Sequence, residues 1–506
     1  MSLDVTETTG VAPAQAPGDA TLRWHRMHPV TPLVRGWTAL LMVVVFAVWQ
    51  GADTLGEDGP DLGEHLGVIG LIFLGLAVLI FAGMWLSWRF MAYAISLDEV
   101  HLRRGVVFKQ QRHARLDRIQ AVDLRSPLVA RLFGLSELRV ESAGGADSAI
   151  IIGFLRNAEA QALRADLLQR AAIKSGRAAA PEASAETAPA GQPAAGLPPT
   201  PQPEQEMYAV EPRTLFGSLL RSPVMWVAAG LVVAVLVLVI VLREPALLIS
   251  LGPIALAAVS LLWSRFASEF NFKAAHSPAG IHVTRGLLET RSQTLPAGRV
   301  QAVSLTQPLL WRRKDWWRVR VNVAGYSVGS TNTTGSEQAA AQSVLLPVGP
   351  RAQALTAMWL VLPELGVENP LEVLDEGLTG IQPRSGITPP TRPSGAPTRF
   401  TNAPKRAWIV DPLAWRRDAY AVTDTALLLR RGRIIRRLDV VPHAKMQSVS
   451  LQQGPLQRRL RVATFCVHST AGVVVPTVPH LDQHDAARLL DEQAARSLAA
   501  RTSEAA

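Results

Sequence analysis

The chain has 506 residues, of which 48% are hydrophobic and only 18% are charged. This length allows several domains, and the apolar share argues against an ordinary soluble protein. The formal net charge is +10. In a soluble chain that balance favours nucleic-acid binding, whereas in a membrane protein it first indicates basic cytoplasmic segments. A single cysteine, Cys466, excludes an intrachain disulfide.

The chain begins with a polar, Ala/Pro-rich stretch, which predicts a disordered tail over 1–20 and no cleaved signal peptide. A first membrane hairpin is expected over 21–90. Its two spans, Gly36–Ala52 and Leu66–Trp88, contain no Asp, Glu, Lys or Arg, and each is near the length that crosses a bilayer. The intervening stretch 53–64 is acidic and has no Lys or Arg, so we expect it outside the cell.

A second membrane hairpin is expected over 208–265, with spans Ser222–Leu242 and Pro245–Ser264. Arg213 and Arg221 precede it and Arg265 follows it. Because Lys and Arg favour the cytoplasmic side, both ends of each hairpin are expected in the cytoplasm. All large soluble regions and both termini then lie in that compartment.

Three copies of one module form the strongest internal signal. Each copy has a glycine after a strand-like run, and a glutamine in an Arg/Lys-x-Gln-x-Val box follows 15 residues later. The three pairs are Gly105 and Gln120, Gly286 and Gln301, and Gly432 and Gln447. A repeat of this length indicates domain duplication. A hairpin turn with positive φ explains the glycines without a functional role.

The modules are expected over 91–172, 266–365 and 405–497, and disordered linkers over 173–207 and 366–404. Apolar and polar residues alternate in each copy, which predicts β-strands. Copies one and three end in helix-like runs, 158–170 and 485–498. One such helix can cover the open apolar face of a small curved sheet.

This arrangement resembles the bacterial pleckstrin-homology (PH)-like membrane proteins of the YdbT type. The resemblance rests on residues 24–29 (WHRMHP) before a membrane hairpin, on the box at 118–122 (RIQAV), and on the second hairpin and the further modules. It implies a bent antiparallel sheet of about seven strands capped by a C-terminal helix in each module. Copy two departs from the pattern through a polar loop insertion over 324–343.

The fold class expected is therefore an α+β membrane protein with four transmembrane helices in two hairpins and three PH-like modules. The resemblance implies location in a bacterial cell membrane, no known enzyme activity, and a smaller PH-like membrane protein as a protein partner. No nucleophile, phosphate-loop, dinucleotide or metal-ligand motif occurs, so we expect no enzyme, no cofactor and no metal.

Two basic clusters are the candidate contact residues. They are Arg430, Arg431, Arg433, Arg436 and Arg437 in copy three, and Arg312, Arg313 and Lys314 with Trp316 and Trp317 in copy two. Cations interleaved with aromatic residues suit an anionic lipid surface. An ordinary solvated face and a protein or nucleic-acid partner are the other interpretations, although no nucleic-acid-binding motif occurs.

The leading hypothesis is a non-enzymatic membrane scaffold whose cytoplasmic modules bind protein partners or the anionic membrane surface. The alternative is a component of a transport or export system in which the four helices form the pathway. A pathway needs polar groups inside the spans, and the four spans contain no ionisable residue.

Overall fold

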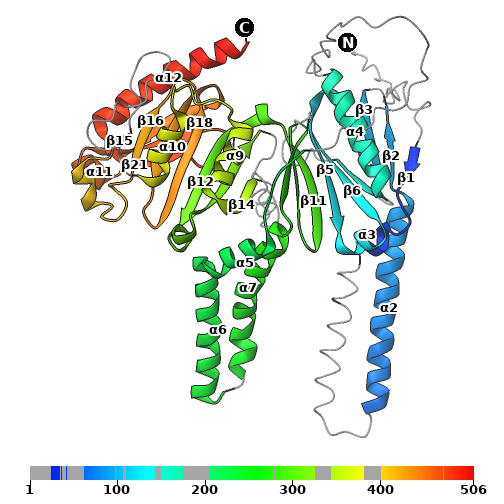
Figure 1. Cartoon of the computed structure of the whole chain (residues 1–506). Helices are drawn as coiled ribbons and strands as arrows, with labels where there is room; N and C mark the ends of the chain where they lie inside the picture. Colours follow the sequence, from blue (N-terminus) through cyan, green and yellow to red (C-terminus); the bar gives the residue numbers. More distant parts are fainter. Residues whose placement is uncertain are drawn as a thin grey trace, which may run out of the picture. The chain divides into compact units, whose positions relative to one another are not determined.

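The computed structural model describes residues 24–34, 36, 42, 62–96, 98–105, 110–142, 150–174, 205–244, 246–277, 280–324, 343–380, 400–470 and 472–505. The chain divides into two compact units, and Figure 1 labels their helices and strands. The first unit contains the first hairpin and most of module one. The second contains strand β5, helix α3 and every described element from residue 205 onward.

Module one has seven strands and a C-terminal helix among its described residues. They are β1 (Trp24–Arg26), β2 (Ala92–Ile95), β3 (Glu99–Arg104), β4 (Gln110–Arg115), β5 (Ile119–Pro127), β6 (Leu135–Ser142), β7 (Ile150–Arg156) and α4 (Asn157–Lys174), with the short helix α3 (Leu128–Leu132) after β5. Strands β1 to β4 form one antiparallel sheet in that order. Strands β6 and β7 form an antiparallel pair.

Module two repeats this order with seven described strands and two helices. They are β8 (Gln205–Ala209), β9 (Lys273–Ser277), β10 (Gly280–Arg285), β11 (Glu289–Leu295), β12 (Val300–Pro308), β13 (Trp316–Val323), β14 (Val344–Pro350), α9 (Arg351–Val361) and α10 (Pro370–Thr379). A short 3-10 helix, η4 (Leu309–Lys314), follows β12 as α3 follows β5. The polar loop expected over 324–343 lies almost entirely outside the described residues.

Module three also has seven described strands. They are β15 (Thr401–Asn402), β16 (Ala419–Val422), β17 (Ala426–Arg431), β18 (Ile435–Pro442), β19 (Ser448–Gln452), β20 (Val462–His468) and β21 (Thr477–Asp482), with α11 (Pro455–Arg459) after β19 and α12 (Gln483–Ala505) at the end. Gln120 and Gln301 are each the second residue of β5 and β12, and Gln447 directly precedes β19. The repeat signature therefore marks the same strand in all three modules.

Each segment expected to form a membrane hairpin lies between the first and second strands of a module. Strand β1 pairs with β2 across the first hairpin, and β8 pairs with β9 across the second. The boundaries expected at residues 91 and 266 were therefore wrong, because the first strand of each module lies before its hairpin. Both ends of a hairpin thus lead into neighbouring strands of one sheet.

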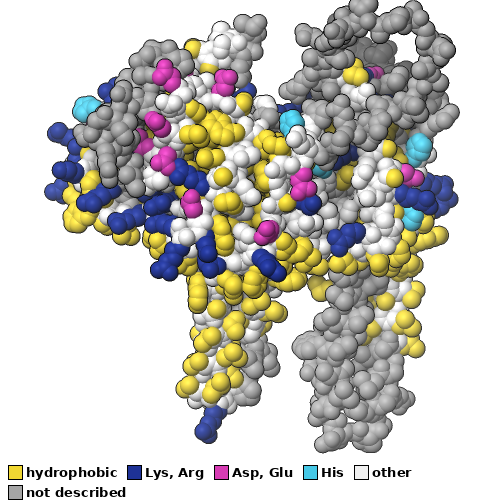
Figure 2. Space-filling view, in the orientation of Figure 1, with side chains coloured by type: hydrophobic (Ala, Val, Ile, Leu, Met, Phe, Trp, Pro, Cys, Tyr) yellow, Lys and Arg dark blue, Asp and Glu magenta, His cyan; other side chains and the backbone are white. Residues whose placement is uncertain are grey.

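Three described helices are long and apolar enough to cross a membrane. They belong to α2 (Leu62–Arg89), α6 (Pro223–Leu242) and α7 (Ala246–Glu269). Their apolar side chains are exposed, as the second hairpin in Figure 2 shows. Of the first expected span only Gly36 and Met42 are described, so the total of four spans stays a prediction.

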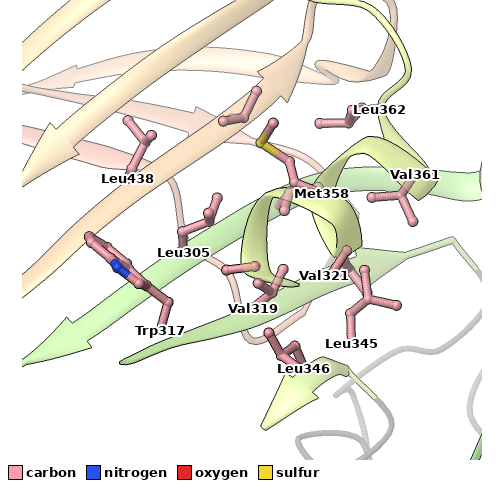
Figure 3. Close-up of a cluster of buried hydrophobic side chains, with 14 of the residues drawn as sticks. Leu305, Trp317, Val319, Val321, Leu345, Leu346, Met358, Val361, Leu362 and Leu438 are labelled. Atoms are coloured by element: carbon pink, nitrogen blue, oxygen red, sulfur yellow. The ribbon is translucent and has the colours of Figure 1, made fainter. Parts of the chain in front are cut away.

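Neighbouring modules share sheets. Strand β5 pairs with β11, and β12 pairs with β18, all antiparallel. The core of module two therefore includes Leu438 of β18, beside Leu305 of β12 and Met358 of α9 (Figure 3). In the same way, Ala302 of β12 belongs to the core cluster of module three. Each buried aliphatic side chain of this kind contributes roughly 1.5–3 kcal/mol, so these cores join modules two and three.

The linker expected over 366–404 was wrong at both of its ends. Helix α10 occupies Pro370–Thr379, and its Val373, Leu374 and Leu378 are buried in the module-two core. Strand β15 begins at Thr401. The segment as a whole is rich in Pro, Thr, Gly and Arg, and this composition predicted a linker in spite of these three apolar residues. Residues 381–399 lie outside the described part of the chain.

The three repeat glycines adopt positive φ, at 110° for Gly105, 112° for Gly286 and 77° for Gly432, which confirms the turn expected from the sequence. A Cβ at Gly432 would collide with the carbonyl oxygen of Ile435.

We predict that Gly432→Ala lowers the free energy of unfolding by about 1 kcal/mol or more, because the side chain is strained at this φ and has no room. The measurement is denaturant unfolding of the detergent-solubilised full chain. Gly454→Ala is the matched control, since Gly454 has φ −73° and a Cβ there would meet nothing closer than 3.8 Å. Equal stability of the two variants would contradict the turn geometry.

Candidate functional site

One surface of the second unit combines exposed apolar side chains with cations. It is formed by η4 and by the turn Gly432–Ile435 between β17 and β18, and we call it the basic loop pair. Its exposed residues are Leu309, Leu310, Arg313 and Lys314 of η4, and Arg433, Ile434 and Ile435 of the turn. Dark-blue and yellow side chains gather along the side of this unit from which the second hairpin extends (Figure 2).

The register of β12 and β18 brings the two halves of the basic loop pair together. Pro308, which precedes η4, lies opposite Ile435. The guanidinium of Arg312 donates to the carbonyl oxygens of Arg433 and, at 3.3 Å, of Ile434. Arg436 donates to Oε1 of Gln307 at 3.3 Å. The exposed apolar residues are therefore held on one rigid edge.

Trp311 ties the basic loop pair to the foot of the second hairpin. Its side chain is buried, and its Nε1 donates to the carbonyl oxygen of Ser218 at 3.0 Å. Ser218 lies on α5 (Pro212–Leu220), and only Arg221 and Ser222 separate α5 from α6. The guanidinium of Arg221 lies 5.5 Å from the ring centroid of Trp316.

A second loop pair has the same construction one module earlier, from α3 and the turn Gly286–Glu289. Leu128, Leu132 and Leu288 are exposed on it. The two halves are joined by an ion pair, in which Arg125 donates to Oε2 of Glu289 at 2.7 Å. We call this the apolar loop pair.

The apolar loop pair is fixed to the end of α7. The backbone N–H of Gly286 donates to the carbonyl oxygen of Phe270 at 2.7 Å, and that of Leu287 to the carbonyl oxygen of Ala267 at 2.8 Å. Both loop pairs therefore contact residues at or near the end of a helix that is apolar and long enough to cross a membrane. The apolar loop pair was not predicted, although the shared Pro–Leu step after β5 and β12 and the Leu-Leu after Gly286 were signals for it.

The structure separates the predicted arginines of module three into structural and exposed residues. Arg430 is 1% exposed, and its guanidinium donates to the carbonyl oxygens of Arg417 and Glu376 and to Oδ1 of Asn402. It also lies 4.7 Å from the ring centroid of Phe400. Arg430 is therefore a structural residue, and its prediction as a surface contact was wrong.

Arg431 also makes interactions within the module. Its guanidinium donates to Oγ1 of Thr477 and to the carbonyl oxygen of Val475, and it lies 3.7 Å from Oδ2 of the buried Asp439. Arg436 and Arg437 are half-buried on β18, and Arg433 alone of the five arginines is fully exposed.

The two tryptophans of module two differ in the same way. Trp317 is 2% exposed, and its Nε1 donates to Oδ1 of Asp315 at 2.8 Å, so its prediction as a surface contact was wrong. Trp316 is half-buried and packs edge-on against Trp311, with ring centroids 6.5 Å apart. Alternation along β13 explains the difference, because consecutive residues of a strand point to opposite faces.

The cations of the basic loop pair crowd one another. Burial lowers the pKa of Arg312, and the neighbouring charges of Arg436 and Arg433 lower it further. Burial also lowers the pKa of Arg430, to about 10, while Glu376 and Asp418 oppose the shift. Arg430 has these acidic neighbours, whereas the cations Arg436 and Arg433 lie beside Arg312.

No group of three or more His, Cys, Asp or Glu side chains in the described residues is arranged to hold a metal ion. Cys466 is buried on β20, and burial raises the pKa of its thiol. This sulfur is therefore a protonated core group at neutral pH.

Comparison with known proteins identifies the modules. The family model described as "Bacterial PH domain" matches residues 39–171, 222–355 and 397–497, well over half of the chain. The chain belongs to the bacterial PH domain family. The three matches correspond to the three modules; the second includes both α6 and α7, and the first begins within the first expected span.

Among curated proteins, the chain is similar to the UPF0699 transmembrane protein YdbT of Bacillus subtilis (strain 168). The two are 25% identical over 126 residues, which is 24% of this chain and 25% of that protein. No solved structure matches the chain. The family and the apolar helices together establish a YdbT-type membrane protein with repeated PH domains, as the sequence predicted.

We predict that Arg430→Gln lowers the free energy of unfolding by roughly 3 kcal/mol, because it removes charge-assisted hydrogen bonds and leaves buried carbonyl oxygens without donors. Denaturant unfolding of the full chain in detergent, followed by tryptophan fluorescence, measures the loss. The matched control is Arg433→Gln, two residues beyond β17, which we expect to change stability by less than about 0.5 kcal/mol. Similar losses in the two variants would contradict the structural role of Arg430.

Proposed function

We propose that the protein is a non-enzymatic scaffold of the bacterial cell membrane, whose PH modules rest on the anionic cytoplasmic lipid surface through the basic and apolar loop pairs. The observation that carries this proposal is the hydrogen bond from Trp311 to Ser218. It fixes η4 beside the helix that leads into span α6, and this supports a position of the exposed Leu and Ile residues and cations near the lipid headgroups.

Aromatic and apolar residues around the hairpin support this depth. Trp226 in the first turn of α6 is 65% exposed, and Trp263 near the end of α7 is 52% exposed. Tryptophan prefers the membrane–water interface. Leu309 and Ile434 are exposed near the same end of the hairpin, where apolar side chains can enter the headgroup region while neighbouring cations meet lipid phosphates.

The charge distribution supports a cytoplasmic position of the modules. Arg213 and Arg221 precede span α6, and Arg265 directly follows the span expected from the sequence, Pro245–Ser264. The stretch 53–64 between the first two expected spans is acidic. Because basic residues are retained in the cytoplasm, this pattern favours modules on the same side as anionic lipid.

A scaffold of this kind would also hold protein partners, and a smaller PH-like membrane protein is the partner we propose from the resemblance.

The test uses the full chain, with Cys466 replaced by alanine, in lipid nanodiscs. An environment-sensitive fluorophore is attached to Ile434→Cys on the basic loop pair. We predict blue-shifted emission, quenched by lipids with a spin label near the headgroup, in discs containing anionic lipid. The shift should weaken in neutral discs and at high salt, because each surface cation near anionic lipid contributes roughly 1 kcal/mol and exposed charges are screened.

Two matched controls accompany this measurement. Arg313→Gln with Lys314→Gln should reduce the quenching, whereas Arg488→Gln with Arg501→Gln removes two exposed cations from α12 and should not. The same fluorophore at Asp491→Cys on α12 should stay unquenched, because α12 lies on the opposite side of this unit from the hairpin (Figure 1). Equal emission at positions 434 and 491 would reject membrane contact.

A further inference from the structure

The two junctions between modules use one register. Pro127 of β5 lies opposite Glu289 of β11, and Pro308 of β12 lies opposite Ile435 of β18. In both cases the proline faces the residue three positions after the turn glycine of the next module. The strand that carries the glutamine box therefore pairs, in a fixed register, with the fourth strand of the following module.

A strand that pairs with the next module, which we call a junction strand, packs its two faces against the cores of two different modules. Val303 and Leu305 of β12 belong to the core of module two, and Ala302 belongs to the core of module three. Ser304 shares the face of Ala302, and its hydroxyl donates to Oδ1 of Asp439 at 2.5 Å. Strand β18, the fourth strand of module three, therefore extends the sheet that contains β12 and supplies the carboxylate that pairs with Ser304.

Strand β19 is the equivalent of β5 and β12 in module three, and it lies at the edge of its sheet. Among the described residues its only paired neighbour is β20. Val449 and Leu451 pack against the module-three core, as Val303 and Leu305 pack in module two. Ser448 is exposed and Ser450 is half-exposed on the other face, where the equivalent Ser304 is buried.

Strand β4 is the fourth strand of module one, equivalent to β11 and β18, and it lies at the edge of its sheet. In the described part of the chain it pairs with β3 alone. Gln110, Gln111 and His113 are exposed along it, whereas the equivalent strands β11 and β18 are covered by β5 and β12. An end strand presents a row of backbone donors and acceptors to a further strand.

We propose that β19 of one copy of this chain pairs antiparallel with β4 of a second copy, in the register of the two internal junctions. Gln452 then lies opposite Gln110, and Ser450 lies opposite Arg112. Ser450 occupies the place of Ser304 and Arg112 the place of Asp439, so the guanidinium can donate to the serine hydroxyl. A second copy is favoured over another protein because one chain carries both halves of the junction.

This contact is heterologous, because it joins two different surfaces. Repetition of it therefore produces a closed ring or an open row of copies along the membrane. The pairing adds a strand to an existing sheet edge, a recognition mode in which main-chain hydrogen bonds supply much of the affinity. The inference does not depend on lipid binding by the loop pairs.

The test joins two differently tagged full-length chains, co-expressed in membranes with Cys466→Ala in both. One chain carries Ser450→Cys and the other Arg112→Cys, so only contact between copies is scored. A short bis-maleimide should yield a species containing both tags. The matched control pairs Ser450→Cys with His25→Cys, because His25 is an exposed residue of β1 at the other end of the same sheet as β4. We expect severalfold more product with Arg112→Cys than with His25→Cys.

Charge variants at one position provide the second arm. Here the cross-linked cysteines replace Gln452 in one chain and Gln110 in the other. Ser450→Arg should remove most of the cross-linked product, because the new cation repels Arg112. Ser450→Asp should keep or increase the amount of cross-linked product. Three outcomes would overturn the pairing of copies. The two charge variants could give equal products, or the His25 control could give as much product as Arg112→Cys. A different protein could also be captured without any species that carries both tags. Fluorophore quenching at position 434 is a separate readout, so failure here leaves the lipid proposal intact.

Discussion

Pairing between strands of neighbouring modules is the constraint on which the second unit depends. β12 contributes Val303 and Leu305 to one core and Ala302 to the next, so both faces of the strand are buried. A strand of this kind cannot leave its neighbour without exposing apolar groups and backbone donors from two modules at once. Modules two and three therefore behave as one folded body rather than as domains on a flexible tether.

The same pairing determines where the loops lie. A fixed register places the short helix after each junction strand against the glycine turn of the next module, as in the contact between Arg312 and Arg433. Contacts of Trp311 with Ser218 and of Gly286 with Phe270 then hold those loops beside the ends of the hairpin inserted between β8 and β9. The proposed membrane contact of this edge would therefore rest on topology first and on exposed residues such as Leu309 and Ile434 second.

The sequence predicted much of this architecture. Identical spacing of Gly105, Gly286 and Gly432 from their glutamines identified three copies, and the positive φ values follow from the same turn in each. Spans α2, α6 and α7 were evident from composition. The hairpin insertion was not predicted, because β1 and β8 are short strands separated from their partners by the whole hairpin, and local periodicity does not report such pairing.

The candidate site was predicted only in part, for a similar reason. The arginines around Gly432 look alike in the sequence, but in the structure they have two different roles. Arg430 points into the module, where Phe400 and two backbone carbonyls receive it, while Arg433 lies beyond the strand in solvent. Sequence alone gives the alternation of a strand but not which face is covered, and here both faces of β17 are covered by different modules.

Buried polar pairs at the junctions specify the register as much as the apolar contacts do. Asp439 is fully buried, and burial raises the pKa of its carboxyl group, while Arg431, Arg437 and the hydroxyl of Ser304 oppose that shift. A slip of one residue between β12 and β18 would leave this carboxyl facing an apolar side chain and would turn the other residues of the strand to the wrong faces. The apolar face alone would tolerate a slip of two residues, because Val303 and Leu305 are alike. The hydrogen bond between Ser304 and Asp439 favours the observed register of β12 and β18, and that register sets the position of the basic loop pair.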